Sequence, residues 1–274
     1  MSDPQAHSLA GPILVGLGFA GLAIGFCVCR VTDLVTLISA GNAQTSPRWR
    51  ERLWVHLFVS GGWSLSFGLV VMHGPPLEAW DVRLPGEATW PVWPWTEYVY
   101  LFGYLTPLVI AWIPRTRERL LRVAWTLVLL TAASTALFLL LPIAAPPRPF
   151  VASSLAGRLL TLETSRPDFA AASFPSFHAL WAILLAQACS DRGGNFSRLA
   201  WAWAGLMSMA CVANGAHALL DVVASWLLYG AIAFRSLPSW LRVSVPLESS
   251  RDFAATSGHS TDQKTYPCAE HESD

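Results

Sequence analysis

Lysine is nearly absent from this sequence. The single lysine is Lys264, near the C-terminus, and every other basic side chain is an arginine. Charged residues make up 13% of the 274 positions, about half the share of an average soluble domain, whereas 53% are hydrophobic. The net charge is zero, and no basic patch runs along any predicted helix. We therefore expect an integral membrane protein that has no nucleic-acid partner.

The sequence also lacks a cysteine pattern. Its five cysteines are scattered, four of them in apolar segments, with no C-x-x-C pair and no cluster with histidine. This distribution is typical of buried free thiols and predicts neither a disulfide framework nor a metal site. We accordingly expect no metal and no cofactor.

Long apolar runs make up most of the remaining sequence. A bilayer core needs roughly 20 apolar residues per helix. Seven candidate spans lie near residues 9–29, 53–72, 96–113, 120–142, 176–190, 199–213 and 217–234. The first eight residues lack the basic region of a secretory signal, so we interpret the run behind them as a retained helix. The sequence predicts an all-α integral membrane protein, a polytopic bundle of six to seven transmembrane helices.

Arginines mark one side of the predicted bundle. They gather in the segments 30–52, 114–119 and 191–198, and again after residue 234. Short loops rich in arginine face the cytoplasm, and these segments alternate strictly along the candidate spans. We therefore expect an extracytoplasmic or lumenal N-terminus and a cytoplasmic C-terminus.

Composition divides the chain into three parts. Residues 1–52 hold an N-terminal transmembrane helix and a basic cytoplasmic loop, residues 53–240 hold the other six spans, and residues 241–274 form a polar tail. The tail has too little apolar surface to offset the entropy of ordering its backbone, which predicts disorder.

Four tryptophans cluster in the outer segment 73–97. They are Trp80, Trp90, Trp93 and Trp95. An aromatic belt at the membrane interface is one interpretation. A re-entrant or surface-lying segment that shapes lipid access is the alternative.

Three unusual segments are predicted to lie on the same face of the membrane. They are PIAAPPRPF at 142–150, SFPSFH at 173–178 and NGAHALLD at 214–221. The arginines that set the orientation lie in other segments, so this agreement is independent of them. The three segments are candidates for one polar, extracytoplasmic site.

His217 and Asp221 are four residues apart at the predicted start of a helix, so they share a face. A carboxylate bonded to one ring nitrogen fixes the tautomer and leaves the other nitrogen as a nucleophile or base. A buried polar pair that holds helices together is the structural alternative. Ionisable groups inside a membrane favour the functional interpretation.

His178 falls in the first turn of the fifth candidate span. Pro175 fits a first helical position, and Ser173 or Ser176 could cap the helix. The unpaired N–H groups and positive dipole end of a helix start favour phosphate binding. The alternative is a capped helix whose histidine extends to the interface.

Arg148 lies in the proline-rich stretch APPRP after the fourth span. A guanidinium presents a fork of donors that matches two phosphate oxygens, although an interfacial anchor is the simpler interpretation of an arginine there. Taken together, two histidines, a carboxylate and an arginine indicate a phosphoryl-transfer site, where positioning and charge stabilisation supply most of the catalysis.

These residues resemble the type 2 phosphatidic acid phosphatase (PAP2) superfamily, whose motifs are K-x6-R-P, P-S-x-H and S-R-x5-H-x3-D. Arg148-Pro149 matches the end of the first motif, and 175–178 matches the second completely. His217 and Asp221 match the end of the third. The resemblance covers about 75–235 and implies that 53–240 is a PAP2-like catalytic membrane domain.

The sequence departs from these motifs at the positions of a lysine and an arginine, which are both replaced by uncharged residues. The lysine of the first motif falls at Leu141, and the Ser-Arg pair of the third falls at Ala210 and Cys211. Similar losses occur in inositol phosphorylceramide synthase-like phosphotransferases. The strings LPIAAPPRPF and AASFPSFHAL are similar to the inositolphosphotransferase-type members of that branch.

The resemblance implies a role for each matching residue. His217 attacks phosphorus to form a phosphohistidine, and Asp221 orients it. His178 protonates the leaving oxygen and later activates the acceptor. Arg148 and the N–H groups around Ser176 hold the phosphate of a membrane lipid, and the acceptor is water or an alcohol such as inositol.

Two other classes of function stay open on the sequence. A membrane haem protein could use His56, His178 and His217 as axial ligands, although Asp221 and Arg148 would then have no role. A catalytically inactive scaffold or transporter with the same fold would account for the lost Lys and Ser-Arg.

Overall fold

The computed structural model describes residues 43–73, 79–141, 143–165 and 173–234, together with Asp33 and Thr36. This part of the chain is helical, and its only β-type pairing is an isolated bridge between Trp80 and Ile143. The predicted all-α fold class is therefore confirmed. The predicted span 9–29 and the predicted tail 241–274 lie outside the described residues, so both stay predictions.

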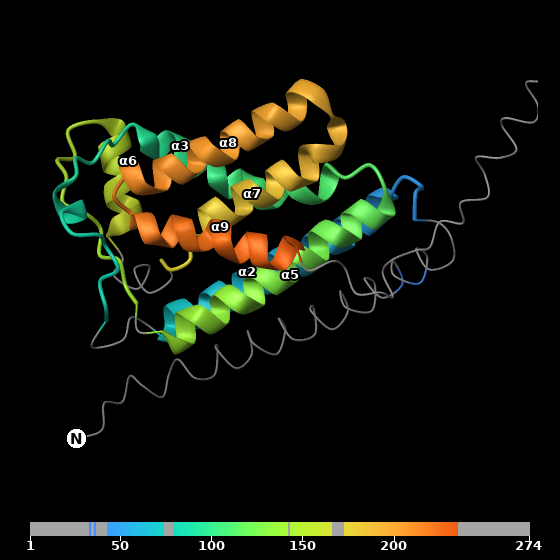
Figure 1. Cartoon of the computed structure of the whole chain (residues 1–274), viewed down its shortest axis with the longest axis horizontal. Helices are drawn as coiled ribbons and strands as arrows, with labels where there is room; N and C mark the ends of the chain where they lie inside the picture. The colour runs from blue at the N-terminus through green and yellow to red at the C-terminus, as the bar shows by residue number, and fades with distance from the viewer. Residues whose placement is uncertain are drawn as a thin grey trace, which may run out of the picture.

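Two long helices run side by side along one flank of the bundle, α2 (Trp49–His73) and α5 (Arg117–Leu140) (Figure 1). Both are long and apolar enough to cross a bilayer, as is α8 (Gly194–Ala213). The helices α7 (Phe177–Cys189) and α9 (Leu219–Phe234) are shorter and also apolar. Each of these five helices coincides with a candidate span.

A buried ion pair holds α2 and α5 together at one end. The guanidinium of Arg117 donates to both carboxylate oxygens of Glu51, each at 2.9 Å, and its third donor reaches Thr45 Oγ1 at 2.6 Å. Thr116 caps α5 by accepting a hydrogen bond from Arg119 N at 3.3 Å. Because both carboxylate oxygens are engaged, this pair fixes the relative orientation of the two helices.

The third candidate span, 96–113, is not one continuous helix. It consists of α3 (Thr96–Phe102), η3 (Gly103–Leu105), α4 (Thr106–Val109) and η4 (Ile110–Trp112). Proline has no N–H, so Pro107 cannot donate to Gly103 O as a continuous α-helix requires. Thr106 N donates to Gly103 O instead, which tightens the backbone at that point.

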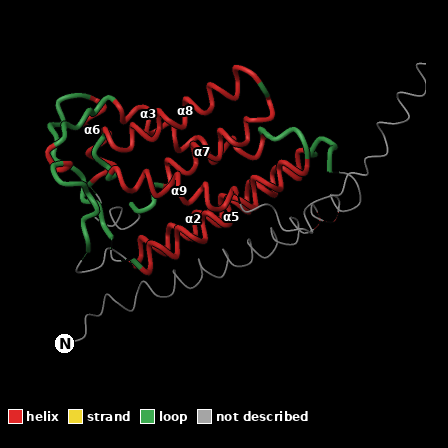
Figure 2. Tube along the Cα trace, in the orientation of Figure 1, coloured by secondary structure: helices red, strands yellow, loops and turns green. Residues whose placement is uncertain are grey.

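The segment between α5 and α7 contains a helix that the hydropathy pattern does not predict, α6 (Leu155–Thr164). Ser154 caps it by accepting from Gly157 N at 3.1 Å. Figure 2 shows α6 and α3 at the same end of the bundle as the starts of α7 and α9. This end carries most of the described loops.

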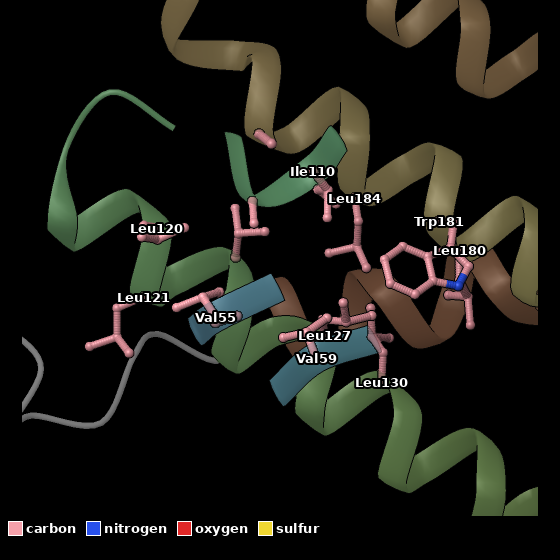
Figure 3. Close-up of a cluster of buried hydrophobic side chains, with 14 of the residues drawn as sticks. Val55, Val59, Ile110, Leu120, Leu121, Leu127, Leu130, Leu180, Trp181 and Leu184 are labelled. Carbon is pink, nitrogen blue, oxygen red and sulfur yellow. The ribbon is translucent and has the colours of Figure 1, made fainter. Parts of the chain in front are cut away.

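The core forms around α7. Its side chains Leu180, Trp181 and Leu184 meet Leu127 and Leu130 of α5 (Figure 3). The opposite side of α7 packs on α8 through a second cluster. Because α7 is apolar on every face, it is buried within the bundle. Cys189 and Cys211 are buried free thiols, as expected.

We predict that Leu184→Ala lowers stability much more than Leu227→Ala. Leu184 is fully buried, whereas 69% of Leu227 is exposed. Emptying a packed site costs about 2 to 5 kcal/mol, and an exposed truncation costs roughly 0.5 kcal/mol or less. Thermal unfolding of the two purified variants in one detergent measures the difference; equal midpoints would contradict the described core.

Candidate active site

The candidate site forms where the N-termini of α7 and α9 meet. Ser176 N donates to Asp221 O at 3.1 Å, so the two helix starts share a main-chain hydrogen bond. Ser225 Oγ donates to the carbonyl oxygens of Ser176 and Asp221, at 3.0 and 2.8 Å. The segments 173–178 and 214–221 are thus brought together, as predicted.

The start of α7 confirms one prediction and corrects another. Ser176 is the N-cap, since its Oγ accepts from Ala179 N at 3.4 Å. Pro175 precedes this cap, so it does not occupy the first helical position, which belongs to Phe177. The N–H groups around Ser176 stay predicted phosphate donors, although Ser176 N itself donates to Asp221 O.

His217 and Asp221 face each other, as their spacing predicts. His217 Nδ1 is 3.4 Å from Asp221 Oδ2, and the same oxygen accepts from Ala218 N at 2.8 Å. Asp221 is fully buried, and it ties down the residue directly before α9. His217 Nδ1 forms no hydrogen bond with the described residues, although this carboxylate lies within ion-pair distance of it. A proton attracted to Nδ1 by the negative charge leaves the lone pair of His217 on Nε2.

His178 lies close to His217. It is in the first turn of α7, and the two ring centroids are 6.2 Å apart. The Tyr100 ring lies against the His178 ring at 3.8 Å, and Tyr104 meets it edge-on at 4.8 Å. His56, in contrast, is bonded at a helix break, with its Nδ1 3.1 Å from Pro107 O.

Arg148 is held beside this pair in an extended segment. It is 3% exposed, its main-chain N donates to Gly215 O at 3.1 Å, and its guanidinium donates to Trp90 O at 3.3 Å and to Val212 O. Its Nε is buried without a hydrogen-bond partner among the described residues. Burial lowers the pKa of Arg148 and Glu87 acts in the opposite direction, but a guanidinium stays charged in proteins.

Gly215 makes this approach possible. Its φ is +80°, a conformation that side chains other than glycine rarely adopt. A Cβ there would lie 2.9 Å from Val92 Cγ2 and 3.2 Å from Arg148 Cβ. The turn before His217 can therefore pack against Arg148 only because residue 215 has no side chain.

Comparison with known families decides the assignment. The profile described as the PAP2 superfamily matches residues 87–234, more than half of the chain. The chain belongs to the PAP2 superfamily. No curated protein and no solved structure matches it. Membership in this superfamily, with the apolar helices, makes it a membrane protein with a phosphatase-like lipid phosphate function in general terms.

Where the third motif has Ser-Arg, this PAP2 protein has an apolar residue and a thiol. Ala210 and Cys211, at the Ser-Arg positions, are both buried. Ser176 Oγ donates to Cys211 Sγ at 3.6 Å.

Glu87 is a site residue that the sequence did not reveal. It is 0% exposed. Its Oε1 accepts from Leu219 N at 2.8 Å, and its Oε2 accepts from Leu84 N at 2.9 Å. A carboxylate at this position caps α9 and faces the positive end of its dipole.

Glu97 holds the turn that carries His217. It is 0% exposed, and its Oε2 accepts from Asn214 Nδ2 at 3.1 Å. Asn214 Oδ1 in turn accepts from Ala216 N at 3.0 Å. A carboxylate within an apolar candidate span was the available signal for Glu97, whereas nothing in the sequence connected it with Asn214.

An apolar cavity of about 380 Å³ is lined by side chains of α8 and α9. Trp90, Trp93 and Arg148 line it together with Met209 and Val222. All four tryptophans of the outer segment are exposed, which agrees with either predicted interpretation of that cluster. The cavity gives the PAP2 site a hydrophobic surface next to its arginine.

We predict that Gly103→Ala disturbs His178 specifically. A Cβ at Gly103 would lie 3.0 Å from His178 Cδ2 and 3.0 Å from Met207 Cε, so the imidazole must move. Gly205→Ala is the matched control, because nothing lies within 4 Å of that Cβ. Overpacking costs about 1 to 3 kcal/mol.

The measurement compares thermal midpoints and lipid phosphate turnover of the two variants. We expect Gly103→Ala to lose both stability and turnover while Gly205→Ala retains them. Equal behaviour of the two variants would show that the α3–α7 contact at His178 is not as close as described.

Proposed function

We propose that this protein transfers a phosphoryl group of a membrane lipid phosphate through a phosphohistidine on His217. The observation that carries the proposal is the pairing of His217 Nδ1 with the buried Asp221 carboxylate at 3.4 Å, with the His178 ring 6.2 Å away. A carboxylate-oriented imidazole with a lone pair on Nε2 is a suitable nucleophile for phosphorus. Two imidazoles at this distance can serve one phosphoryl group.

The proposed reaction has two balanced steps. In the first, Nε2 of His217 bonds to phosphorus while the P–O bond to the leaving group breaks, and His178 protonates the leaving oxygen. In the second, His178 accepts the proton of the acceptor hydroxyl, whose oxygen bonds to phosphorus as the N–P bond breaks. Both steps use the same two rings, and neither needs a metal or a cofactor.

Arg148 is proposed to stabilise the phosphate. Its guanidinium is buried beside the turn that carries His217, and its Nε–H has no hydrogen-bond partner in the part of the chain that the structure describes. A buried charge without a full set of partners is costly, which favours an anionic ligand there. The apolar cavity that Arg148 also lines supports a substrate with a hydrocarbon chain.

We favour transfer to an alcohol over hydrolysis. The cation positions of the motifs hold Leu141 and Cys211. Similar losses occur in the inositol phosphorylceramide synthase-like branch, which the strings LPIAAPPRPF and AASFPSFHAL resemble. The proposed activity is therefore that of an inositol phosphorylceramide or sphingolipid synthase-like phosphotransferase, acting on the extracytoplasmic or lumenal side.

We predict that His217→Ala and Asp221→Asn each lower turnover, by about 10⁴-fold or more for the nucleophile. Asp81→Asn is the matched control, because Asp81 pairs with Arg83 in the outer loop. Purified protein is incubated with phosphatidate, phosphatidylinositol and an isoprenoid phosphate, with and without inositol or ceramide, and released phosphate and new lipids are measured.

We expect turnover in the wild type and in Asp81→Asn only. A His217→Ala variant that retains activity would refute the mechanism. A wild type that acts on none of these donors would favour the inactive scaffold.

A further inference from the structure

Tyr100 contacts both histidines of the proposed reaction. It lies on α3 and is 4% exposed. Its hydroxyl oxygen is 3.4 Å from His217 Nε2, a long hydrogen bond, and its ring lies 3.8 Å from the His178 ring at an angle of 31°. The hydroxyl therefore meets His217 at the nitrogen that would bond to phosphorus.

The direction of this hydrogen bond follows from the tautomer of His217. With its proton on Nδ1, facing Asp221, the ring offers only a lone pair at Nε2. A neutral phenol is then the donor and the imidazole the acceptor. In the resting site, the Tyr100 O–H donates to the Nε2 lone pair of His217.

The same hydroxyl meets a second need of the reaction. Negative charge on the phosphoryl oxygens must be stabilised, and the motif cations that would do so are replaced by Leu141 and Cys211. Donors that are already in place next to a reacting group stabilise its charge without reorganisation. Tyr100 O–H is such a donor, positioned by its ring contact with His178.

We propose that Tyr100 is a further catalytic residue, which donates its hydrogen bond to Nε2 of resting His217 and then to a phosphoryl oxygen of the phosphohistidine. This inference rests on the proposed function. As the Nε2 lone pair forms the N–P bond, the phenol O–H turns to a non-bridging oxygen on the same phosphorus. Tyr100 keeps its proton throughout, and His178 makes the only proton transfers.

Tyr104 supplies the matched control. It follows Tyr100 by one helical turn, and its ring meets His178 edge-on at 4.8 Å. Its hydroxyl, however, donates to Glu163 Oε1 rather than to a histidine. Tyr104→Phe thus removes a hydroxyl near the site without changing the contacts of His217 Nε2.

The experiment follows phosphohistidine formation and turnover in wild type, Tyr100→Phe and Tyr104→Phe. Full-length proteins in detergent receive the donor lipid that supports wild-type turnover, labelled at phosphorus, and acid-labile label is measured over time. We expect Tyr100→Phe to lower kcat and the rate of labelling about 100-fold or more, with KM changed less than about threefold because the lost contact belongs to the transition state. Tyr104→Phe should stay within about fivefold of wild type on both measures.

Each outcome has a distinct meaning. If the wild type labels and Tyr100→Phe labels equally fast, Tyr100 is not catalytic and the proposed function stands. If the wild type turns lipid over without any acid-labile label, the phosphohistidine is wrong and the role of Tyr100 fails with it. A loss confined to KM would also overturn the inference, since it would make Tyr100 a residue for ground-state binding.

A measurement on the wild type covers the case in which Tyr100→Phe does not fold. Nitrogen NMR of histidine-labelled protein, with the His217 signals assigned from His217→Gln, reports whether Nε2 is a hydrogen-bonded acceptor. We expect an Nε2 shift displaced from that of a free imidazole lone pair. A free-acceptor shift in the resting protein would overturn the inference without any variant of Tyr100.

Discussion

The site depends on the hydrogen bond that joins two helix starts, from Ser176 N to Asp221 O. Each helix start presents unpaired N–H groups and the positive end of a dipole, and bringing two of them together in an apolar bundle is unfavourable unless acceptors are supplied. Glu87 and Asp221 supply these acceptors at α9, and the Ser176 hydroxyl does so at α7. The two helix starts can therefore lie together inside the bundle.

The pairing of His217 with Asp221 was predictable because it depends on short-range order. A histidine and an aspartate four residues apart at a helix start must share a face, and a serine before an apolar run caps it. Their convergence with Arg148 was predictable from loop alternation. The hydrogen bonds of Glu87 with Leu219 and of Glu97 with Asn214 were not predictable, because they join residues more than a hundred positions apart.

The third candidate span shows the same limit in its backbone. Hydropathy predicts one helix there, and only Pro107 indicates in the sequence that it breaks. The break at Pro107 and the absence of a side chain at Gly103 allow this segment to approach α7 closely. That approach places Tyr100 against His178. The interrupted helix at 96–112 thus allows the contact between Tyr100 and His178.

The capping of α9 by Glu87 has a consequence for the way a substrate arrives. The segment around Glu87 also supplies the Trp90 carbonyl that holds Arg148. A movement of this segment away from the bundle would break the hydrogen bond from Leu219 N to Glu87 and the one from Arg148 to Trp90 O. Both donors are then left without these acceptors, at a cost of several kcal/mol. The segment around Glu87 is therefore a fixed wall of the site.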